Sequence, residues 1–260
     1  IEYNISKKYL GDQFMKKKNP NASQANDKID ESKLTFHNYL WYLIIFSILG
    51  LIVETIFCFI TTGNLESRKG LILGPLCPIY GVGALIIIFL LNRYKGQKLK
   101  LFVYGTILGG VLEYVISFIL ESIYGARFWD YSWLEFNLNG RICLRYSVYW
   151  GILTLLVINV FKKYIDKLIN KIKGKPRLIV DIIVSIALVL DVIFTVWGIS
   201  VYRTRAKETL NGKNYITNNT AIQRFENTVF SNEIMSSIFP NLQIVDNEGN
   251  LTYITSIYNK

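Results

Sequence analysis

The sequence gathers charged side chains at a few places between long apolar runs. Residues 112–151 hold the densest group, in which carboxylates and guanidinium groups stand among tryptophans and tyrosines. A charge at membrane depth costs roughly 3 kcal/mol or more unless it faces a partner or water, so such groups are candidates for function. We predict a polar cavity for a small polar solute, ion or lipid headgroup, lined by Glu54, Glu113, Glu121, Asp130, Arg141 and Arg145.

Small residues and carboxylates share a stripe in the third apolar run. Residues four apart lie on one face of a helix, and small residues allow close helix packing in lipid. The stripe consists of Gly105, Gly109, Glu113, Ser117 and Glu121, and the first run has a similar one in Ser47, Gly50, Glu54 and Cys58. We therefore expect the first and third runs to pack together with Glu54 near Glu113. Two carboxylates so close need either protonation of one of them or a cation between them. The cation is a metal ion, which the sequence does not define, or one of the available arginines, Arg127, Arg141 and Arg145.

Arg141 and Arg145 stand one helical turn apart where the fourth run begins. Such a pair suits the recognition of a carboxylate or phosphate. The alternative, which we favour, is an internal salt bridge to Glu113, Glu121 or Asp130. Asp130 follows Trp129, and tryptophan gathers at the headgroup level of a membrane, so Asp130 could stand there without a specific role. Alternatively, it is a partner of Arg141 or Arg145, or it acts as a ligand.

A second group of residues is predicted to be structural. The segment GPLCPIYG contains Pro75, Cys77 and Pro78, and proline breaks helices, so it forms either a broken helix lining a cavity or a helix entry turn. Trp129 and Trp150 are expected to pack at the site. A disulfide between Cys77 and Cys143 is chemically permitted, although buried free thiols are the default for these two cysteines and Cys58.

Five apolar runs are long enough to predict membrane-spanning helices, which need about 20 residues. They cover residues 39–60, 71–91, 101–120, 146–161 and 178–200. Residues 1–35 predict a basic, disordered arm, residues 36–200 a transmembrane helical domain, and residues 201–260 a small tail domain with a helix between Ile222 and Ile238 and a hairpin between Leu242 and Tyr258. The predicted fold is an all-α polytopic membrane protein with a small α+β C-terminal tail, which we expect to pack on the membrane part or on a partner.

The distribution of basic residues predicts the orientation in the cell membrane. Segments on the amino-terminal side of the five runs carry eighteen Lys and Arg residues, against eleven on the other side. Because positive loops stay inside, the amino terminus is expected in the cytoplasm and the carboxyl terminus outside. The inner segments read as basic linkers without a carboxylate cluster, so the candidate site faces outward.

Composition and motifs exclude several functions. The chain has 260 residues, 51% of them hydrophobic, and a net charge of +10 that lies in short segments between apolar runs, which is unlike a nucleic-acid-binding protein. It has no phosphate-binding loop with lysine, no nucleophile elbow and no zinc-protease motif. No cofactor is predicted. The single histidine, His37, is expected at the membrane interface.

The order of several short motifs resembles one known family of bacterial membrane proteins, called Putative ABC-transporter type IV or ABC transporter permeases. The resemblance covers about Tyr39 to Phe161, and Phe239-Pro240-Asn241-Leu242 is similar to longer members. It is carried by Glu54-Thr55, Gly70 with Gly74–Gly81, Glu113-Tyr114, Leu120-Glu121, Trp129–Ser132, Asn139–Ile142, Ser147 and Trp150-Gly151. The resemblance implies a transport role without a defined substrate. Because this chain contains no ATPase module, an ATP-driven role would require a separate subunit.

Three functions fit these observations. The first, which we favour, is a permease-like protein in the lipid bilayer, acting with an ATPase subunit or as a homo-oligomer. The second is a membrane enzyme at the outer interface, with one carboxylate as general base and the arginine pair holding a phosphate or similar anion. The third is a non-catalytic assembly or sensor protein whose polar cluster is a buried structural network.

Overall fold

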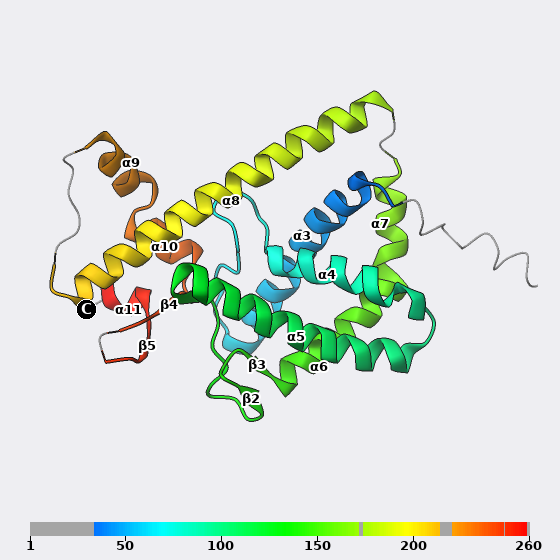
Figure 1. Ribbon diagram of the computed structural model, residues 1–260, viewed down its shortest axis with the longest axis horizontal. Helices are drawn as coiled ribbons and strands as arrows, with labels where there is room; N and C mark the ends of the chain where they lie inside the picture. The colour runs from blue at the N-terminus through cyan, green and yellow to red at the C-terminus, as the bar shows by residue number, and fades with distance from the viewer. Residues whose placement is uncertain (1–33, 172–173, 214–219, 247, 259–260) are drawn as a thin grey trace, which may run out of the picture. The chain divides into compact units, whose positions relative to one another are not determined.

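The computed structural model describes residues 34–171, 174–213, 220–246 and 248–258 (Figure 1). The predicted arm, apart from its last two residues, lies outside this part of the chain. Residues 37–260 form one unit, and every contact discussed below lies within it.

Among the described residues, four helices are long and apolar enough to cross a membrane. Three of them are α3 (Phe36–Thr62), α5 (Lys98–Tyr124) and α8 (Lys175–Leu210). The fourth is one continuous helix that consists of α6 (Leu144–Leu156), the π-helical turn η3 (Val157–Phe161) and α7 (Lys162–Ile169). A shorter apolar helix, α4 (Pro78–Leu91), is followed by the 3₁₀ turn η2 (Asn92–Tyr94). The prediction of an all-α polytopic membrane protein is confirmed, with one of the five apolar runs forming this shorter helix.

The second apolar run is not helical from Leu71, as predicted, because α4 begins only at Pro78. Proline at the first position of a helix is favourable, whereas Pro75 interrupts the preceding segment. Helix α8 satisfies the freed backbone groups of that segment. The Ile72 N–H donates to Thr195 Oγ1 at 2.9 Å, and the N–H groups of Leu73 and Gly74 donate to the Asp191 carboxylate at 3.0 and 2.7 Å. This pairing explains how irregular backbone is tolerated between membrane helices.

The glycine stripe of α5 packs against α6, not against α3 as expected. A side chain at Gly105 would meet Thr154, and one at Gly109 would meet Trp150. The stripe of α3 faces α4 instead, since a side chain at Gly50 would meet Tyr80. Tyr80 of α4 therefore lies beside α3, at the position where we expected α5.

Two helices extend beyond their predicted ends. The fourth run was predicted over residues 146–161, but the helix continues through α7 to Ile169. Helix α8 has 36 residues and a length of about 54 Å, well beyond the roughly 30 Å of a hydrocarbon core. Its C-terminal part carries the tail elements, which surround it in Figure 1. The predicted boundary between residues 200 and 201 thus falls inside a helix.

The tail contains α9 (Ala221–Val229), α10 (Asn232–Ile238), β4 (Gln243–Val245), β5 (Leu251–Tyr253) and α11 (Ile254–Tyr258). Strands β4 and β5 form the predicted hairpin, although residues 254–258 are helical and not extended. Strand β4 also pairs with β1 (Ala126–Arg127), which follows α5. Buried Tyr202 of α8 joins tail residues such as Phe230 and Ile244 in one apolar cluster. The same cluster includes Ile72, Ala126 and Ile199, so the tail packs against residues that precede it in the chain.

Candidate functional site

Glu113 lies on α5 and is only 6% exposed. The Tyr131 hydroxyl donates to one of its carboxylate oxygens at 2.7 Å, and Trp150 Nε1 donates to the other at 3.2 Å. Trp150 reaches this position because Gly109 leaves room for α6 against α5. Both donors are neutral, so Glu113 is held by hydrogen bonds without a cation in contact.

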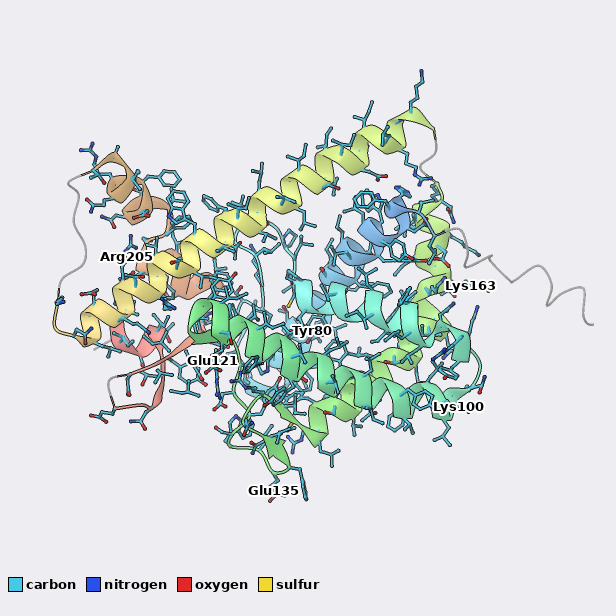
Figure 2. All side chains as sticks on the ribbon, viewed as in Figure 1. Tyr80, Lys100, Glu121, Glu135, Lys163 and Arg205 are labelled. Carbon is cyan, nitrogen blue, oxygen red and sulfur yellow. The ribbon has the colours of Figure 1, made fainter. Side chains whose placement is uncertain are left out.

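Glu54, on α3, lies close to the same group. The Tyr80 hydroxyl of α4 donates to Glu54, and the Tyr80 ring stacks on Trp150 with 5.8 Å between ring centroids. Glu54 and Glu113 are near enough for their charges to interact, and Tyr80 interacts electrostatically with both. We call Glu54 and Glu113 the carboxylate pair. Tyr80 is marked near the centre of Figure 2.

The charge of the carboxylate pair is not neutralised by direct ion pairs. Within the described part of the chain, no Lys or Arg forms a salt bridge with either residue. Arg68 interacts electrostatically with Glu54, but its guanidinium group contacts Cys58 Sγ at 2.7 Å and Glu66 at 3.3 Å. A proton or a bound cation could therefore neutralise the negative charge of the carboxylate pair.

The tyrosine that holds Glu113 keeps its proton. Tyr131 lies in the loop after α5, where burial and the adjacent Glu113 carboxylate raise the pKa of its hydroxyl well above the usual value. The hydroxyl remains a hydrogen-bond donor over the physiological pH range. Tyr131 also stacks on Tyr146 at 4.6 Å, so the site has aromatic walls on two sides of Glu113.

Three of the other predicted site residues belong to a separate ion-pair network with Arg127. Glu121 contacts Arg127 Nε at 2.7 Å and the Arg141 guanidinium group at 2.8 Å. Asp130 lies 3.4 Å from Arg127, and Arg141 also donates to Ser117 Oγ at 3.2 Å. Two carboxylates face two guanidinium groups, so the network is balanced. Glu121 is marked in Figure 2.

Arg145 lies apart from both groups. It is exposed in the first turn of α6, and it takes part in no salt bridge among the described residues. The arginine fork proposed from the sequence is therefore not formed: Arg141 makes the internal salt bridge that we favoured, while Arg145 faces outward.

The residues predicted to be structural occupy three positions. Trp129 Nε1 donates to the Arg141 carbonyl at 2.9 Å, which fixes the loop between α5 and α6, and Trp150 holds Glu113. Cys77 and Pro78 start α4, and the Cys77 N–H donates to the Ser47 carbonyl at 3.2 Å. All three cysteines are buried free thiols, so Cys77 and Cys143 form no disulfide.

Sequence reasoning missed a second buried polar cluster at the start of α3. His37 Nδ1 lies 2.7 Å from the Asp181 carboxylate, which also accepts from Trp41 at 3.0 Å. Asp166 accepts from the Tyr42 hydroxyl and lies 2.9 Å from Lys162 Nζ. The expectation of plain basic linkers without a carboxylate cluster on this side is wrong. The signal was present in the sequence, since Asp166 stands four residues after Lys162.

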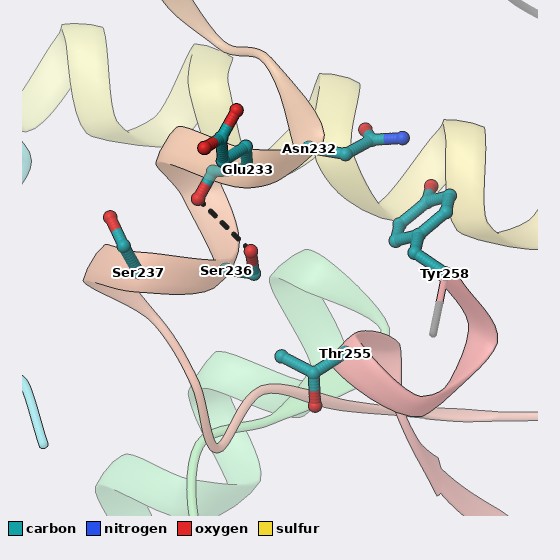
Figure 3. A pocket seen from close by; sticks show the side chains of 6 residues that line it. All are labelled: Asn232, Glu233, Ser236, Ser237, Thr255 and Tyr258. Carbon is teal, nitrogen blue, oxygen red and sulfur yellow. Dashed lines mark hydrogen bonds between the residues drawn. The ribbon is translucent and has the colours of Figure 1, made fainter. Parts of the chain in front are cut away.

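Two further observations concern ligand binding. Within the described residues, no group of three or more His, Cys, Asp or Glu side chains could hold a metal ion. The tail has a polar cavity of about 420 Å³ (Figure 3). Its lining residues are Asn232, Glu233, Ser236, Ser237, Thr255 and Tyr258. None of the residues predicted from the sequence lines it.

Comparison with known proteins places these groups in a family context. A family model described as "Putative ABC-transporter type IV" matches residues 41–196. The match covers more than half of the 260 residues and includes the carboxylate pair and the ion-pair network. No curated protein and no solved structure matches the chain.

Proposed function

The chain belongs to the ABC-transporter type IV family of membrane proteins, and from this premise we propose that it is a multi-pass permease in which Glu54 and Glu113 bind a small cationic solute. The observation that carries the proposal is the carboxylate pair, because neither member forms a salt bridge with any of the described residues. Ionisable groups inside a membrane protein are costly, and they mark ion or solute pathways by default.

The arrangement of helices supports transport. The pair joins α3 to α5, and Tyr80 brings α4 into the same site. A cation that binds between the two carboxylates would stabilise one arrangement of these helices over another, which is what a solute-coupled change requires. Aromatic rings beside the carboxylates add attraction for a cation whose hydration shell is partly removed.

The alternative of an enzyme acting on an anionic substrate has less support. It needs Arg141 and Arg145 to hold a phosphate, but Arg141 is engaged by Glu121 and Arg145 is exposed.

An ATP-driven permease would need an ATPase subunit as a partner. That partner and the predicted orientation, with the amino terminus in the cytoplasm, belong to the proposal.

Carbodiimide labelling tests the site directly. This reagent modifies carboxyl groups in apolar surroundings, and mass spectrometry of peptides locates the modified residue. We expect Glu54 or Glu113 to be labelled in proteoliposomes, and sodium, ammonium or tetramethylammonium ions to protect it. Exposed Glu135, marked in Figure 2, is the internal reference, because no cation should protect it selectively.

Flux measurements with the same cations complete the test. Glu113→Gln should abolish uptake by proteoliposomes, while the matched change Glu135→Gln should leave uptake unchanged. If no cation protects the carboxylate pair, and Glu113→Gln behaves like the unmodified protein, the pair is a structural feature and the proposed function fails.

A further inference from the structure

The loop between α5 and α6 exposes three large apolar side chains. Trp133 is 73% exposed, Phe136 is 80% exposed and Leu138 is 54% exposed. We call these three residues the apolar tip. They lie within residues 133–138, in a loop whose other residues make many polar contacts, so the exposure is concentrated in one short segment.

The backbone presents the tip in an uncommon conformation. Phe136 has φ of +54°, in the left-handed region that aromatic residues rarely adopt. Its carbonyl accepts from the Leu144 N–H at 3.2 Å, which ties the residue to the first turn of α6. Because this conformation is unfavourable for an aromatic residue, the surrounding contacts of the loop must stabilise it.

The motif residues around the tip hold it in place. The Tyr131 N–H donates to the Gly140 carbonyl at 2.7 Å, and Asn137 Nδ2 donates to the Leu134 carbonyl at 2.6 Å. Strand β2 (Asn137–Leu138), which contains the tip residue Leu138, pairs with β3 (Ile142–Cys143). A side chain at Gly140 would collide with Asp130, so glycine is required where the loop closes. The apolar side chains are thus displayed on a fixed frame.

The position of the loop identifies what covers the tip. The loop follows the end of one membrane helix at Tyr124 and precedes the next at Leu144. It folds back along α5, where Tyr131 reaches Glu113, so the exposed tip lies beside the last three turns of a membrane helix. Tryptophan and other aromatic residues favour the headgroup level of a bilayer, and leucine favours the acyl region below it. We propose that the apolar tip inserts into the lipid headgroup–acyl boundary and anchors this loop to the membrane.

The charged neighbours of the tip agree with a shallow insertion. Glu135 stands between Trp133 and Phe136, and Figure 2 shows it at the far end of the loop, away from the helices. A carboxylate there stays in water and limits the depth that the tip reaches. Exposed Arg145 supplies a cation at the start of α6 for lipid phosphate groups. Arg145, which belongs neither to the carboxylate pair nor to the ion-pair network with Arg127, thus has a role at the membrane surface.

The anchor has its own test, which does not depend on solute binding. The protein is placed in liposomes of phosphatidylcholine brominated at defined acyl carbons, and the fluorescence of Trp133→Phe is subtracted from that of the unchanged chain. We expect the Trp133 difference signal to be lost when bromine lies at a shallow acyl position, and to be preserved in the presence of aqueous iodide. Trp133→Phe keeps an aromatic side chain, so the fold is retained.

Two outcomes would overturn the anchor. One is a Trp133 signal that iodide removes and brominated lipid does not, which places the tip in water. The other is a signal protected from both reagents together with Trp133→Cys cross-linking of two copies, which makes the tip an interface between copies. Phe136→Gly separates backbone strain from anchoring: glycine adopts positive φ freely, so this variant should be no less stable in detergent yet should reduce the shallow quenching of Trp133.

Discussion

Two buried polar clusters lie along helix α3, and they differ in how their charges are balanced. Near the start of α3, each carboxylate contacts a basic side chain: Asp181 lies 2.7 Å from His37, and Asp166 lies 2.9 Å from Lys162. Further along the helix, Glu54 and Glu113 contact neutral tyrosine and tryptophan donors. The first cluster is therefore typical of a structural network that joins helices. The second cluster has two carboxylates that contact no basic side chain among the described residues, as expected of a site that binds a cation.

The geometry of His37 strengthens this contrast. Its Nδ1 faces the Asp181 carboxylate, and its Nε2 lies 3.2 Å from the Ile169 carbonyl. The ring thus has a possible hydrogen-bond partner on each side, and it joins α3 to the end of α7 and to the N-terminal part of α8. Arg177, 3.9 Å from Asp181, adds a cation near the carboxylate.

The largest expected loss of stability follows from breaking the His37 link. Asp181→Asn removes the buried carboxylate that contacts His37 and Trp41, and removing one partner of a buried pair costs about 3 kcal/mol or more. We expect the free energy of unfolding in detergent to fall by about that amount. His37→Asn combined with Asp181→Asn should cost little more than Asp181→Asn alone, because the two residues act as one unit. A loss below about 1 kcal/mol for Asp181→Asn would contradict the link.

The Lys162–Asp166 pair should show a smaller and non-additive effect. Lys162→Met leaves Asp166 with the Tyr42 hydroxyl alone, and we expect a loss of about 2 kcal/mol in the free energy of unfolding. Adding Asp166→Asn removes the unpaired charge while keeping an acceptor for Tyr42. The double variant should therefore be more stable than Lys162→Met, which thermal unfolding of both variants can measure. Additive losses would show that the pair is not coupled.

The same contrast shows what could be predicted from the sequence. The four-residue stripes of α3 and α5 correctly indicated one close-packed face on each helix, because helical periodicity fixes which side chains share a face, but they predicted the wrong partners, since α3 packs on α4 and α5 packs on α6. Periodicity did not place Tyr80. Its position depends on the irregular backbone of residues 71–77, which is held by Asp191 and Thr195 of a helix more than a hundred residues away.

The cluster at the start of α3 was missed for a related reason. The apolar composition of the fourth run ends at Phe161, which predicts a loop for Lys162 and Asp166. The helix continues through them because the two side chains neutralise each other and the aliphatic part of a lysine packs well against apolar neighbours. Likewise, Arg127 was considered as a cation for the carboxylates, but its partner depends on the fold of the loop after α5.

A substitution in the carboxylate pair should change the free energy of unfolding less than a substitution in the His37–Asp181 pair. Glu113→Gln retains an oxygen acceptor for Tyr131 or Trp150 and removes a negative charge that faces Glu54. We expect the free energy of unfolding to change by no more than about 1 kcal/mol, although cation binding is lost. Side-by-side unfolding of Glu113→Gln and Asp181→Asn measures the difference. Equal losses would favour the reading of both clusters as structural networks.

The smallest effect is expected for a carboxylate that faces water, which sets the reference for the buried ones. Asp246 lies in the turn between β4 and β5, where the Asn250 N–H donates to it at 2.8 Å and the Glu248 N–H at 2.9 Å. These hydrogen bonds hold the pKa of Asp246 below its usual 3.8. The ionised group therefore stabilises the hairpin above pH 3.8, and this contribution is lost as the pH falls through the lowered pKa.

Hydrogen exchange of residues 243–253, corrected for the intrinsic pH dependence of the reaction, measures this contribution. Protection of the hairpin should fall slightly below pH 3.8 in the unchanged chain. In Asp246→Asn it should be weaker at neutral pH and should not change over the same acidic range, because the titrating group is absent. A similar acid response in both would assign it to other carboxylates, such as Glu248. In either case the loss of stability should be far smaller than the loss caused by Asp181→Asn, because water already solvates the charge at Asp246, whereas the Asp181 carboxylate is buried against His37.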